Sequence, residues 1–326
     1  MDRGKGTTTD VLSDVLRAVR LTGAVYFDNE LSSPWVAAMP RITEIAAKVM
    51  PGAQRVIEYH LIARGECWGH AVGEEPIRLR EGDIIVFPQG AAHVLSSAPG
   101  MRAEPDMSRY ARPSTSLPLF YELGGGGPDR ARIVCCFLGC DDRPYNPLLA
   151  ALPAVIHLPA AAPETTTGWL ATLLGNAARE SRNGRPGGEN VRERLSELMF
   201  VETIRQYLET LPPSQTGWLA GLRDPVVGRA LAALHGEPRR AWTVEGLARV
   251  GGVSRSVLAE RFAEMVGQPP MQYLALWRMQ LASRLLLEGS GVAEVADAVG
   301  YESEAAFSRA FKKRVGQSPA AWRRAR

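Results

Sequence analysis

Two stretches near the C-terminus decide the fold of this region: SRSVLAERFAEMVGQPPMQYL at residues 254–274 and SEAAFSRAFKKRVGQSPAAWR at residues 303–323. They align without gaps at an offset of 49 residues. The identical positions include Ser254/Ser303, Phe262/Phe311, Val266/Val315, Gly267/Gly316, Gln268/Gln317 and Pro270/Pro319. Such self-similarity indicates that one supersecondary unit occurs twice.

Each copy follows a short helical segment and a turn. In the first copy Thr243 can cap the short helix, Gly252 permits a sharp turn, and Ser254 can cap the next helix. In the second copy Gly300 and Ser303 take the places of turn and cap. This is the helix-turn-helix arrangement, whose second helix enters the major groove of DNA.

The segment between the copies predicts a long connecting helix. Pro269 and Pro270 begin it and Gly289 ends it, which leaves about 19 residues, or ~28 Å at 1.5 Å per residue. Recognition helices that occupy successive major grooves stand about 34 Å apart. A rigid helix of this length can set that spacing within one chain.

Charge is divided unevenly along the chain. Residues 218–326 contain 16 Lys and Arg against 10 Asp and Glu, whereas the preceding residues contain 22 against 25. A basic C-terminal part is typical of a region that meets a polyanion, although many basic faces are only solvated.

The preceding half has the short period of β-strands. From residue 24 the apolar runs are AVYF, RVIEYHLIA, CWGHAV, IRL, DIIVFP, HVLS and RIVCCFL. Gly, Pro and acidic turns separate them, which predicts an antiparallel barrel or sandwich. Residues 98–130, rich in Pro, Ser and Gly, predict a long mobile loop, and residues 11–21 predict a helix capped by Asp10.

Helical periodicity returns at residues 165–179 and 188–211. The longer segment carries a stripe of apolar residues: Leu195, Leu198, Met199, Ile204 and Leu208. The stripe is explained equally by packing against the chain's own β-domain and by a homodimer interface. Residues 212–217 break the helix and predict a linker.

The expected fold is multidomain α+β. An antiparallel β-barrel at 1–160 is followed by a helical linker or dimerisation region at 161–213 and an all-α domain at 214–326. No apolar run approaches the ~18 residues of a membrane span, and no signal peptide is recognisable, so we expect a cytoplasmic protein. Four cysteines do not make a disulfide framework.

The C-terminal region, about residues 224–324, resembles the AraC/XylS family of transcription regulators. The matching motifs are Leu247-Ala248, Ser254-x3-Leu258, Phe262-x4-Gly267-x2-Pro270-x2-Tyr273, Arg278, Ala282, Leu285-Leu286, Ala296-x3-Gly300-Tyr301 and Phe307-x-Arg309-x-Phe311-x4-Gly316-x2-Pro319. The sequence departs from the family at Glu260, where a basic residue is common, and at Tyr301, which replaces Phe.

By position, the resemblance implies a set of DNA-contacting residues: Arg255, Ser256, Ala259, Glu260, Glu304, Ala305, Ser308, Arg309, Lys312 and Lys313. Arg255 and Arg309 suit bidentate contacts to guanine, and the glutamates could accept from cytosine. Lys312 and Lys313 are expected to contact phosphates. A structural ion pair is the alternative interpretation of Arg309.

Residues 82–93 fit the second cupin motif, with Gly82-Asp83, Pro88-x-Gly90 and His93, whereas Ser97 stands where Asn is usual. The first motif is degraded to Tyr59-His60-Leu61. With Ser33-Pro34-Trp35 and Asn146-Pro147-Leu148-Leu149, the N-terminal half resembles the cupin sensor domain of one branch of AraC-type regulators.

A barrel could bring together His60, His93 and Cys135, a set that suits zinc, with Cys67, Cys136, Cys140 or water completing it. Cys135 and Cys136 point to opposite faces of a strand, so only one can join an inward cluster. The alternatives are that Cys135 and His93 are core residues, and that the barrel holds an organic effector.

Together these features predict a transcription regulator of the activator type that is not an enzyme. Its DNA binding would respond to a small molecule, a metal or an oxidant sensed in the barrel. We expect double-stranded DNA, RNA polymerase and a second copy of the chain as partners. The alternatives are a cupin metalloenzyme fused to a DNA-binding domain and an architectural DNA-binding protein without an inducer.

Overall fold

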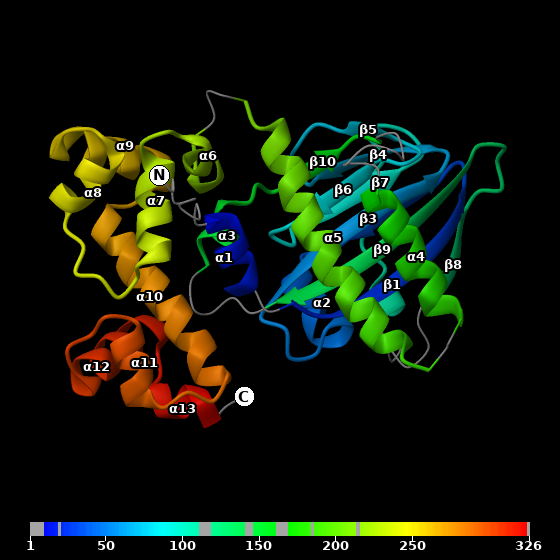
Figure 1. Cartoon of the computed structure of the whole chain (residues 1–326). Coiled ribbons are helices and arrows are strands. Elements are labelled where there is room, and N and C mark those ends of the chain that lie inside the picture. The colour runs from blue at the N-terminus through cyan, green and yellow to red at the C-terminus, as the bar shows by residue number, and fades with distance from the viewer. Residues whose placement is uncertain are drawn as a thin grey trace, which may run out of the picture. The chain divides into compact units, whose positions relative to one another are not determined.

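The computed structural model describes residues 10–18, 21–110, 119–140, 146–160, 169–183, 186–212 and 216–324. The chain divides into two compact units. The sheet unit comprises Arg20–Asp141 and Leu152–Thr210, and the helical unit comprises Met1–Val19, Asp142–Ala151 and Leu211–Arg326. Figure 1 shows the strands of the sheet unit and the helices of the helical unit.

Two β-sheets form the framework of the sheet unit. The six-stranded sheet has the order β10-β6-β3-β9-β1-β8, and the four-stranded sheet has the order β2-β7-β4-β5. The strands are β1 Leu21–Ser32, β2 Val36–Met39, β3 Arg55–Arg64, β4 Glu66–Ala71, β5 Ile77–Arg80, β6 Ile84–Phe87, β7 His93–Ser96, β8 Leu119–Gly124, β9 Arg130–Cys140 and β10 Ile156–Leu158.

The core of the sheet unit lies between the two sheets. Ile62 and Ile133 from the larger sheet pack with Leu79 and Leu95 from the smaller one. Alternate residues of each strand face this layer because strand side chains alternate between faces. Helix α2 (Ile42–Val49) packs against a second apolar cluster that includes Phe137.

The remaining helices of this unit, α4 (Trp169–Asn183) and α5 (Gly188–Thr210), pack against the larger sheet. Figure 1 shows both helices crossing one face of that sheet. The apolar residues Met199 and Ile204 of α5 are fully buried, whereas Leu198 is exposed. The sheet therefore covers much of the apolar stripe of α5, as one of the two interpretations of that stripe requires.

The α+β class predicted from the sequence is confirmed, with corrections inside the sheet unit. The sheets are open rather than closed into a barrel, and β1 and β8 pair in parallel instead of antiparallel. The expected loop at 98–130 contains a 3-10 helix, η1 (Met107–Tyr110), and the strand β8, although residues 111–118 lie outside the described part. β8 finds its partner in β1, about a hundred residues earlier, which local turn chemistry cannot reveal.

Helices alone form the helical unit. They are α1 Val11–Ala18, α3 Pro147–Ala151, α6 Trp218–Arg223, α7 Val227–Gly236, α8 Val244–Gly251, α9 Arg255–Val266, α10 Pro270–Leu287, α11 Val292–Ala298, α12 Glu304–Val315 and α13 Pro319–Arg324. Helix α1 contacts α7 and α10, and α3 contacts α6.

The three-part division expected at 1–160, 161–213 and 214–326 therefore differs from the two compact units. The first helix, which ends at Ala18 rather than near residue 21, and α3 join the helical unit. Helices α4 and α5 join the sheet unit instead of forming a separate region. Long-range packing of apolar faces decides these memberships.

The predicted helix-turn-helix units are present. The hydroxyls of Thr243, Ser254 and Ser303 each accept a backbone N–H from the first turn of their helix. Gly252 has φ +70° and Gly300 has φ +75°, a backbone conformation that favours glycine. A Cβ on Gly300 would also clash with the backbone carbonyl oxygen of Arg239. The α8–α9 and α11–α12 pairs lie toward opposite ends of α10 (Figure 1).

No helix in the described part of the chain is long and apolar enough to cross a membrane.

Candidate functional sites

Strand register places a polar cluster inside the sheet unit. On β3, Glu58 and His60 share one face because they are two residues apart. His60 pairs with Cys135 of β9, and Tyr59 pairs with Cys136 on the opposite face. Cys135 and Cys136 thus point to opposite faces, as the sequence predicts.

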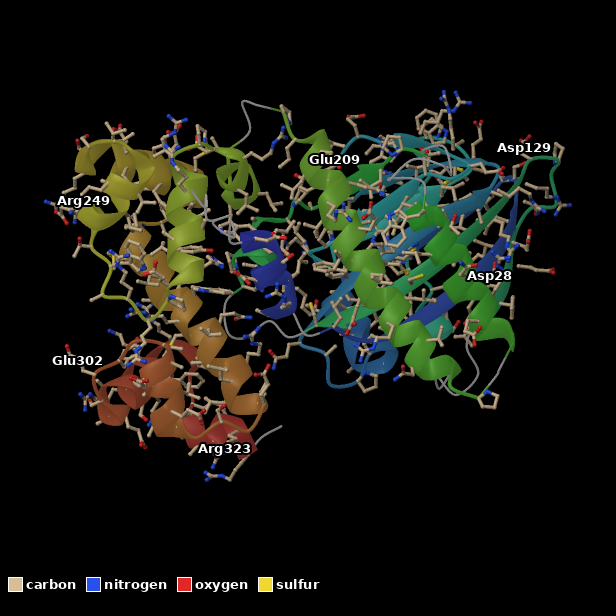
Figure 2. The ribbon with its side chains drawn as sticks, viewed as in Figure 1. Asp28, Asp129, Glu209, Arg249, Glu302 and Arg323 are labelled. Carbon is tan, nitrogen blue, oxygen red and sulfur yellow. The ribbon has the colours of Figure 1, made fainter. Side chains whose placement is uncertain are left out.

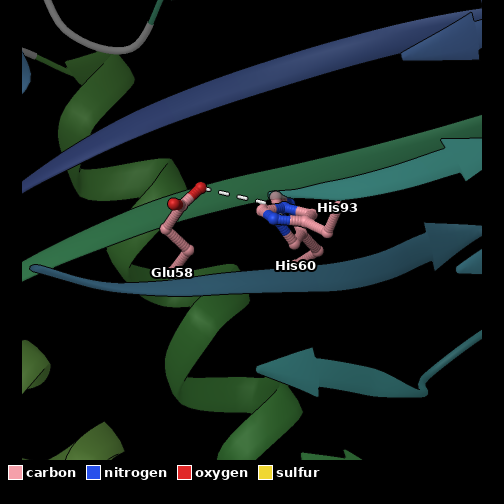
Figure 3. Close-up of side chains that lie close together, drawn as sticks. All are labelled: Glu58, His60 and His93. Carbon is pink, nitrogen blue, oxygen red and sulfur yellow. Dashed lines mark hydrogen bonds and ion pairs between the residues drawn. The ribbon is translucent and has the colours of Figure 1, made fainter. Parts of the chain in front are cut away.

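Glu58, His60 and His93 converge (Figure 3). His60 Nε2 lies 2.8 Å from His93 Nε2, and His93 Nε2 lies 3.8 Å from Glu58 Oε2. One potential ligand atom from each residue falls within 4.8 Å of the others. All three side chains are buried.

Hydrogen bonds fix the orientation of the two imidazoles. His93 Nδ1 lies 2.8 Å from the carbonyl oxygen of Ala91, so Nδ1 donates and the Nε2 lone pair faces His60. His60 Nδ1 lies 2.9 Å from Cys135 Sγ, and Asn29 Nδ2 donates a hydrogen bond to the same sulfur at 3.4 Å. The ring of His93 stacks on Phe87 with a centroid distance of 3.7 Å.

Within the described part of the chain, neither carboxylate oxygen of the fully buried Glu58 has a hydrogen-bond partner. Burial raises the pKa of Glu58 to about 8 and lowers the pKa of His93 to about 4. The pKa of His60 is also lowered well below its usual value, mainly by burial and to a smaller extent by the neighbouring His93. Unpaired buried oxygens cost free energy unless a proton or a cation compensates them.

The structure brings together two of the three residues predicted as metal ligands. His60 and His93 turn their Nε2 atoms toward one point, whereas Cys135 contacts the other ring nitrogen of His60. Among the described residues, the clustered ligand set contains Glu58 and no cysteine. The sequence signal for Glu58 was its spacing, because it stands two residues before His60 and therefore on the same face of the strand.

A cavity of about 60 Å³ lies beside the cluster of Glu58, His60 and His93. His60 belongs to both, and Cys135 also lines the cavity. Most of its other lining is apolar or aromatic, including Trp35 and Phe137, and Arg109 is its only charged lining residue among those described. The guanidinium of Arg109 lies 5.5 Å from the centroid of the Tyr121 ring. The cavity therefore suits a small, mainly apolar molecule.

The predicted DNA-contacting residues all lie on α9 and α12. Arg255, Ser256, Glu260, Glu304, Ala305, Arg309, Lys312 and Lys313 are exposed, and Ala259 and Ser308 are half-buried. Leu258, Phe262, Phe307 and Phe311 are fully buried, as expected for core residues. The outward faces of α9 and α12 are thus available to a ligand of the helical unit.

Ion pairs already engage the arginines of α9. Arg255 Nε lies 2.9 Å from Glu245 Oε1, and Arg261 Nη2 lies 2.5 Å from Asp224 Oδ2. Asp224 also accepts the backbone N–H groups at the start of α7, so Arg261 has a structural partner. Tyr301, the other departure from the family pattern, packs edge-on against Phe307.

The basic residues of α12 differ from the arginines of α9 in their ion pairing. Within the described part of the chain, Arg309, Lys312, Lys313 and Arg314 form no ion pair, and all four are exposed. The alternative interpretation of Arg309 as half of a structural ion pair therefore finds no partner there. Side chains such as Arg249 and Glu302 extend from the surface of this unit (Figure 2).

Two helix-turn-helix units joined by a helix and combined with a two-sheet cupin-like domain define a class of transcription regulator. A cupin family model matches residues 10–209, and a helix-turn-helix domain model matches residues 247–325. The chain belongs to the AraC-like transcription regulators.

Two relatives match most of the chain, and a solved DNA-binding domain matches 31% of it. A putative AraC-like transcription regulator of Streptomyces lividans is 37% identical over 83% of this chain and 88% of its own length. The HTH-type transcriptional regulator AlkR of Acinetobacter baylyi is 30% identical over 96% of this chain and 99% of its own. The DNA-binding domain of AdpA, solved with a target DNA, is 34% identical over 31% of this chain and 92% of that domain, with a TM-score of 0.30.

Proposed function

We propose that the sheet unit of this regulator controls DNA binding by holding a divalent metal ion between Glu58, His60 and His93. The observation that supports this most strongly is the pair of unpartnered oxygens on the buried Glu58. A cation at the point where the three residues converge would compensate the carboxylate and take the lone pairs of both Nε2 atoms.

The donor set is compatible with zinc, which accepts two histidines and one carboxylate and leaves a fourth position for another ligand. His93 Nδ1 is already oriented by the carbonyl of Ala91, as metal-binding histidines usually are. With the ion bound at Nε2, His60 would carry its ring hydrogen on Nδ1. It would then donate a hydrogen bond from Nδ1 to Cys135 Sγ. Cys135 would then orient His60 without binding the metal.

Metal analysis of the purified full-length protein tests this proposal. We expect near-stoichiometric metal in the natural protein, loss of it in Glu58→Gln and His93→Ala, and retention in Cys135→Ser. Chelation should change the affinity for promoter DNA in the natural protein and leave Glu58→Gln unaffected. A metal-free natural protein, or equal metal content in all variants, would contradict the proposal.

A second candidate signal is a small organic effector, which the apolar cavity beside His60 favours. Ala37 lines this cavity, so Ala37→Phe should fill it and abolish any effector-dependent change in DNA affinity. Thermal unfolding with a panel of small aromatic and aliphatic compounds identifies binders, because a ligand of the native state raises the midpoint. A stabilising compound that acts equally on Ala37→Phe does not occupy this cavity.

We favour a regulatory over a catalytic role for the cluster, because its three side chains are enclosed and a substrate would need a path to them. The relatives named above are regulators, which supports the same role. Metal-dependent turnover of any compound by the full-length protein would revive the alternative of a cupin metalloenzyme.

On the DNA side, we propose that α9 and α12 enter successive major grooves and that the residues predicted above read bases and contact phosphates.

Exposed Leu198 and Val191 on α5 support a homodimer contact, which sedimentation of the full-length protein tests. As a regulator that acts on promoters, it would meet RNA polymerase in the cytoplasm.

A further inference from the structure

A cavity in the helical unit has no part in the functions proposed above. It lies beside α1, α7 and α10, has a volume of about 130 Å³, and is lined by Asp14, Arg17, His235, Trp277 and Arg284, among others. Helix α1 is held next to it because Gln280 Nε2 donates a hydrogen bond to the carbonyl of Ala18.

Among the described residues, three side chains that line this cavity carry a hydrogen-bond donor without a partner. His235 is buried, and its Nδ1 atom has no hydrogen-bond partner in the described part of the chain. That atom lies 3.9 Å from Oδ2 of Asp14, another residue that lines the cavity. Trp277 Nε1 is likewise buried and unpartnered. Arg284 Nε lies 3.5 Å from Glu288 Oε1 without donating a hydrogen bond to it.

The protonation of His235 follows from its other nitrogen. Trp218 Nε1 donates to the hydroxyl of Tyr273, and that hydroxyl lies 2.7 Å from His235 Nε2. The hydroxyl proton is then directed to Nε2, and the neutral ring carries its own hydrogen on Nδ1. Burial lowers the pKa of His235 to about 3, which keeps the ring neutral at physiological pH. Nδ1 is therefore a donor in need of an acceptor.

We infer that this cavity binds a small carboxylate, whose oxygens accept hydrogen bonds from His235, Trp277 and Arg284. The two guanidinium groups of Arg17 and Arg284 favour an anion there, and Asp14 is already bonded to Arg17 at 3.0 Å. The volume exceeds the roughly 10–15 Å³ that a cavity needs to hold one water. The proposal does not depend on the metal or effector sites, which lie in the other unit.

Such a ligand would sit close to the first helix-turn-helix unit. His235 contacts Tyr273, and the ring of Tyr273 packs edge-on against Phe262, which is a core residue of α9. The ligand would also lie against α1, so it would link the N-terminal helix to the helices that support α9.

The test uses the indole N–H resonances of the full-length protein, with Trp277→Phe to identify that of Trp277. Acetate is the probe, and acetamide and chloride at matched ionic strength are the controls. We expect acetate alone to move the Trp277 resonance saturably. Arg284→Gln should weaken binding at least tenfold, Asp14→Asn should strengthen it by removing a competing carboxylate, and the exposed Arg249→Gln should leave it unchanged.

An unmoved Trp277 resonance, or equal shifts with acetate, acetamide and chloride, would overturn the inference and leave the cavity to water. Equal affinities in Arg284→Gln and Arg249→Gln would overturn it as well. Because the remaining indole resonances report on folding, a misfolded variant is recognised and is replaced by Arg284→Lys.

Discussion

The two helix-turn-helix units share a core design and differ on the outward faces of their second helices, α9 and α12. Phe262 of α9 and Phe311 of α12 are fully buried at equivalent positions. On α9, by contrast, Arg255 and Arg261 are already paired with acidic residues. On α12 the basic residues carry no such partners within the described chain, so their charges are not neutralised there by acidic side chains.

The interiors differ as well. The helices that support the first unit contain a hydrogen-bonded chain from Trp218 through Tyr273 to His235. The core around Phe307 and Phe311 of the second unit is built from apolar and aromatic side chains. A repeated pattern of caps and apolar positions therefore fixes the same backbone twice, while charge and interior polarity are free to diverge. We expect the second unit to supply most of the electrostatic affinity.

The largest expected effect tests the shared core. Phe262→Ala and Phe311→Ala should each lower the free energy of unfolding by about 3–5 kcal/mol, because each leaves a cavity in a packed core. Chemical denaturation of the full-length protein measures both. A loss below 1 kcal/mol in either one would show that the two cores are not equivalent.

The next effect concerns base reading by α12. Arg309→Ala should reduce the discrimination between operator and random DNA by about 1–3 kcal/mol, as expected for loss of a bidentate contact to guanine. Fluorescence anisotropy with both DNAs measures this difference. Ala substitution of Arg239, which is paired with Asp297, is the control; equal losses on both DNAs would rule out a reading role for Arg309.

Within the helical unit, a pH effect should arise at His235, which lies beside the first helix-turn-helix pair. The folded-state pKa of His235 is lowered to about 3, so the unfolded chain binds a proton there first, and stability falls as the pH drops from about 6.5 toward 3. At pH 5.5 the natural protein should lose about 1.4 kcal/mol more than His235→Gln, relative to pH 7.5. Asp14, Arg17, Arg284 and Tyr273 face this ring and stay in both proteins. Urea denaturation at both pH values that gave equal losses would contradict the assignment.

Phosphate contacts should be weaker and independent of sequence. Lys313→Ala should weaken binding to operator and random DNA alike and lower the slope of log K against log salt by about 0.9. A salt titration of both DNAs measures the slope. An unchanged slope would place Lys313 outside the interface.

The smallest effect concerns the engaged arginine of α9. Glu245→Gln should free Arg255 and strengthen operator binding slightly, because an exposed ion pair contributes only about 0–1 kcal/mol. The Arg255→Ala, Glu245→Gln double variant provides the control, since it should bind the operator no more tightly than Arg255→Ala alone. Weaker binding by Glu245→Gln alone would mean that Glu245 positions Arg255 for DNA.

The N-terminal half shows where sequence patterns stop being sufficient. Its strands at 55–64, 84–87 and 130–140 follow alternation and turn residues, and His60 and His93 follow the cupin motif. Glu58 was missed as a candidate ligand although it stands two residues before His60. The pattern puts it on the inward face, but only the packed sheets show that both its oxygens lack partners.

The sequence by itself determined the two helix-turn-helix units, the helix between them and the α+β class. Caps, glycine turns and apolar periodicity act over a few neighbouring residues, so they are readable without a structure. Only the tertiary structure decided that α1 joins the helical unit, that Arg261 is held by Asp224, and that Cys135 contacts His60 from behind. Those features depend on contacts between residues distant in the chain, where packing selects one partner among many that the sequence allows.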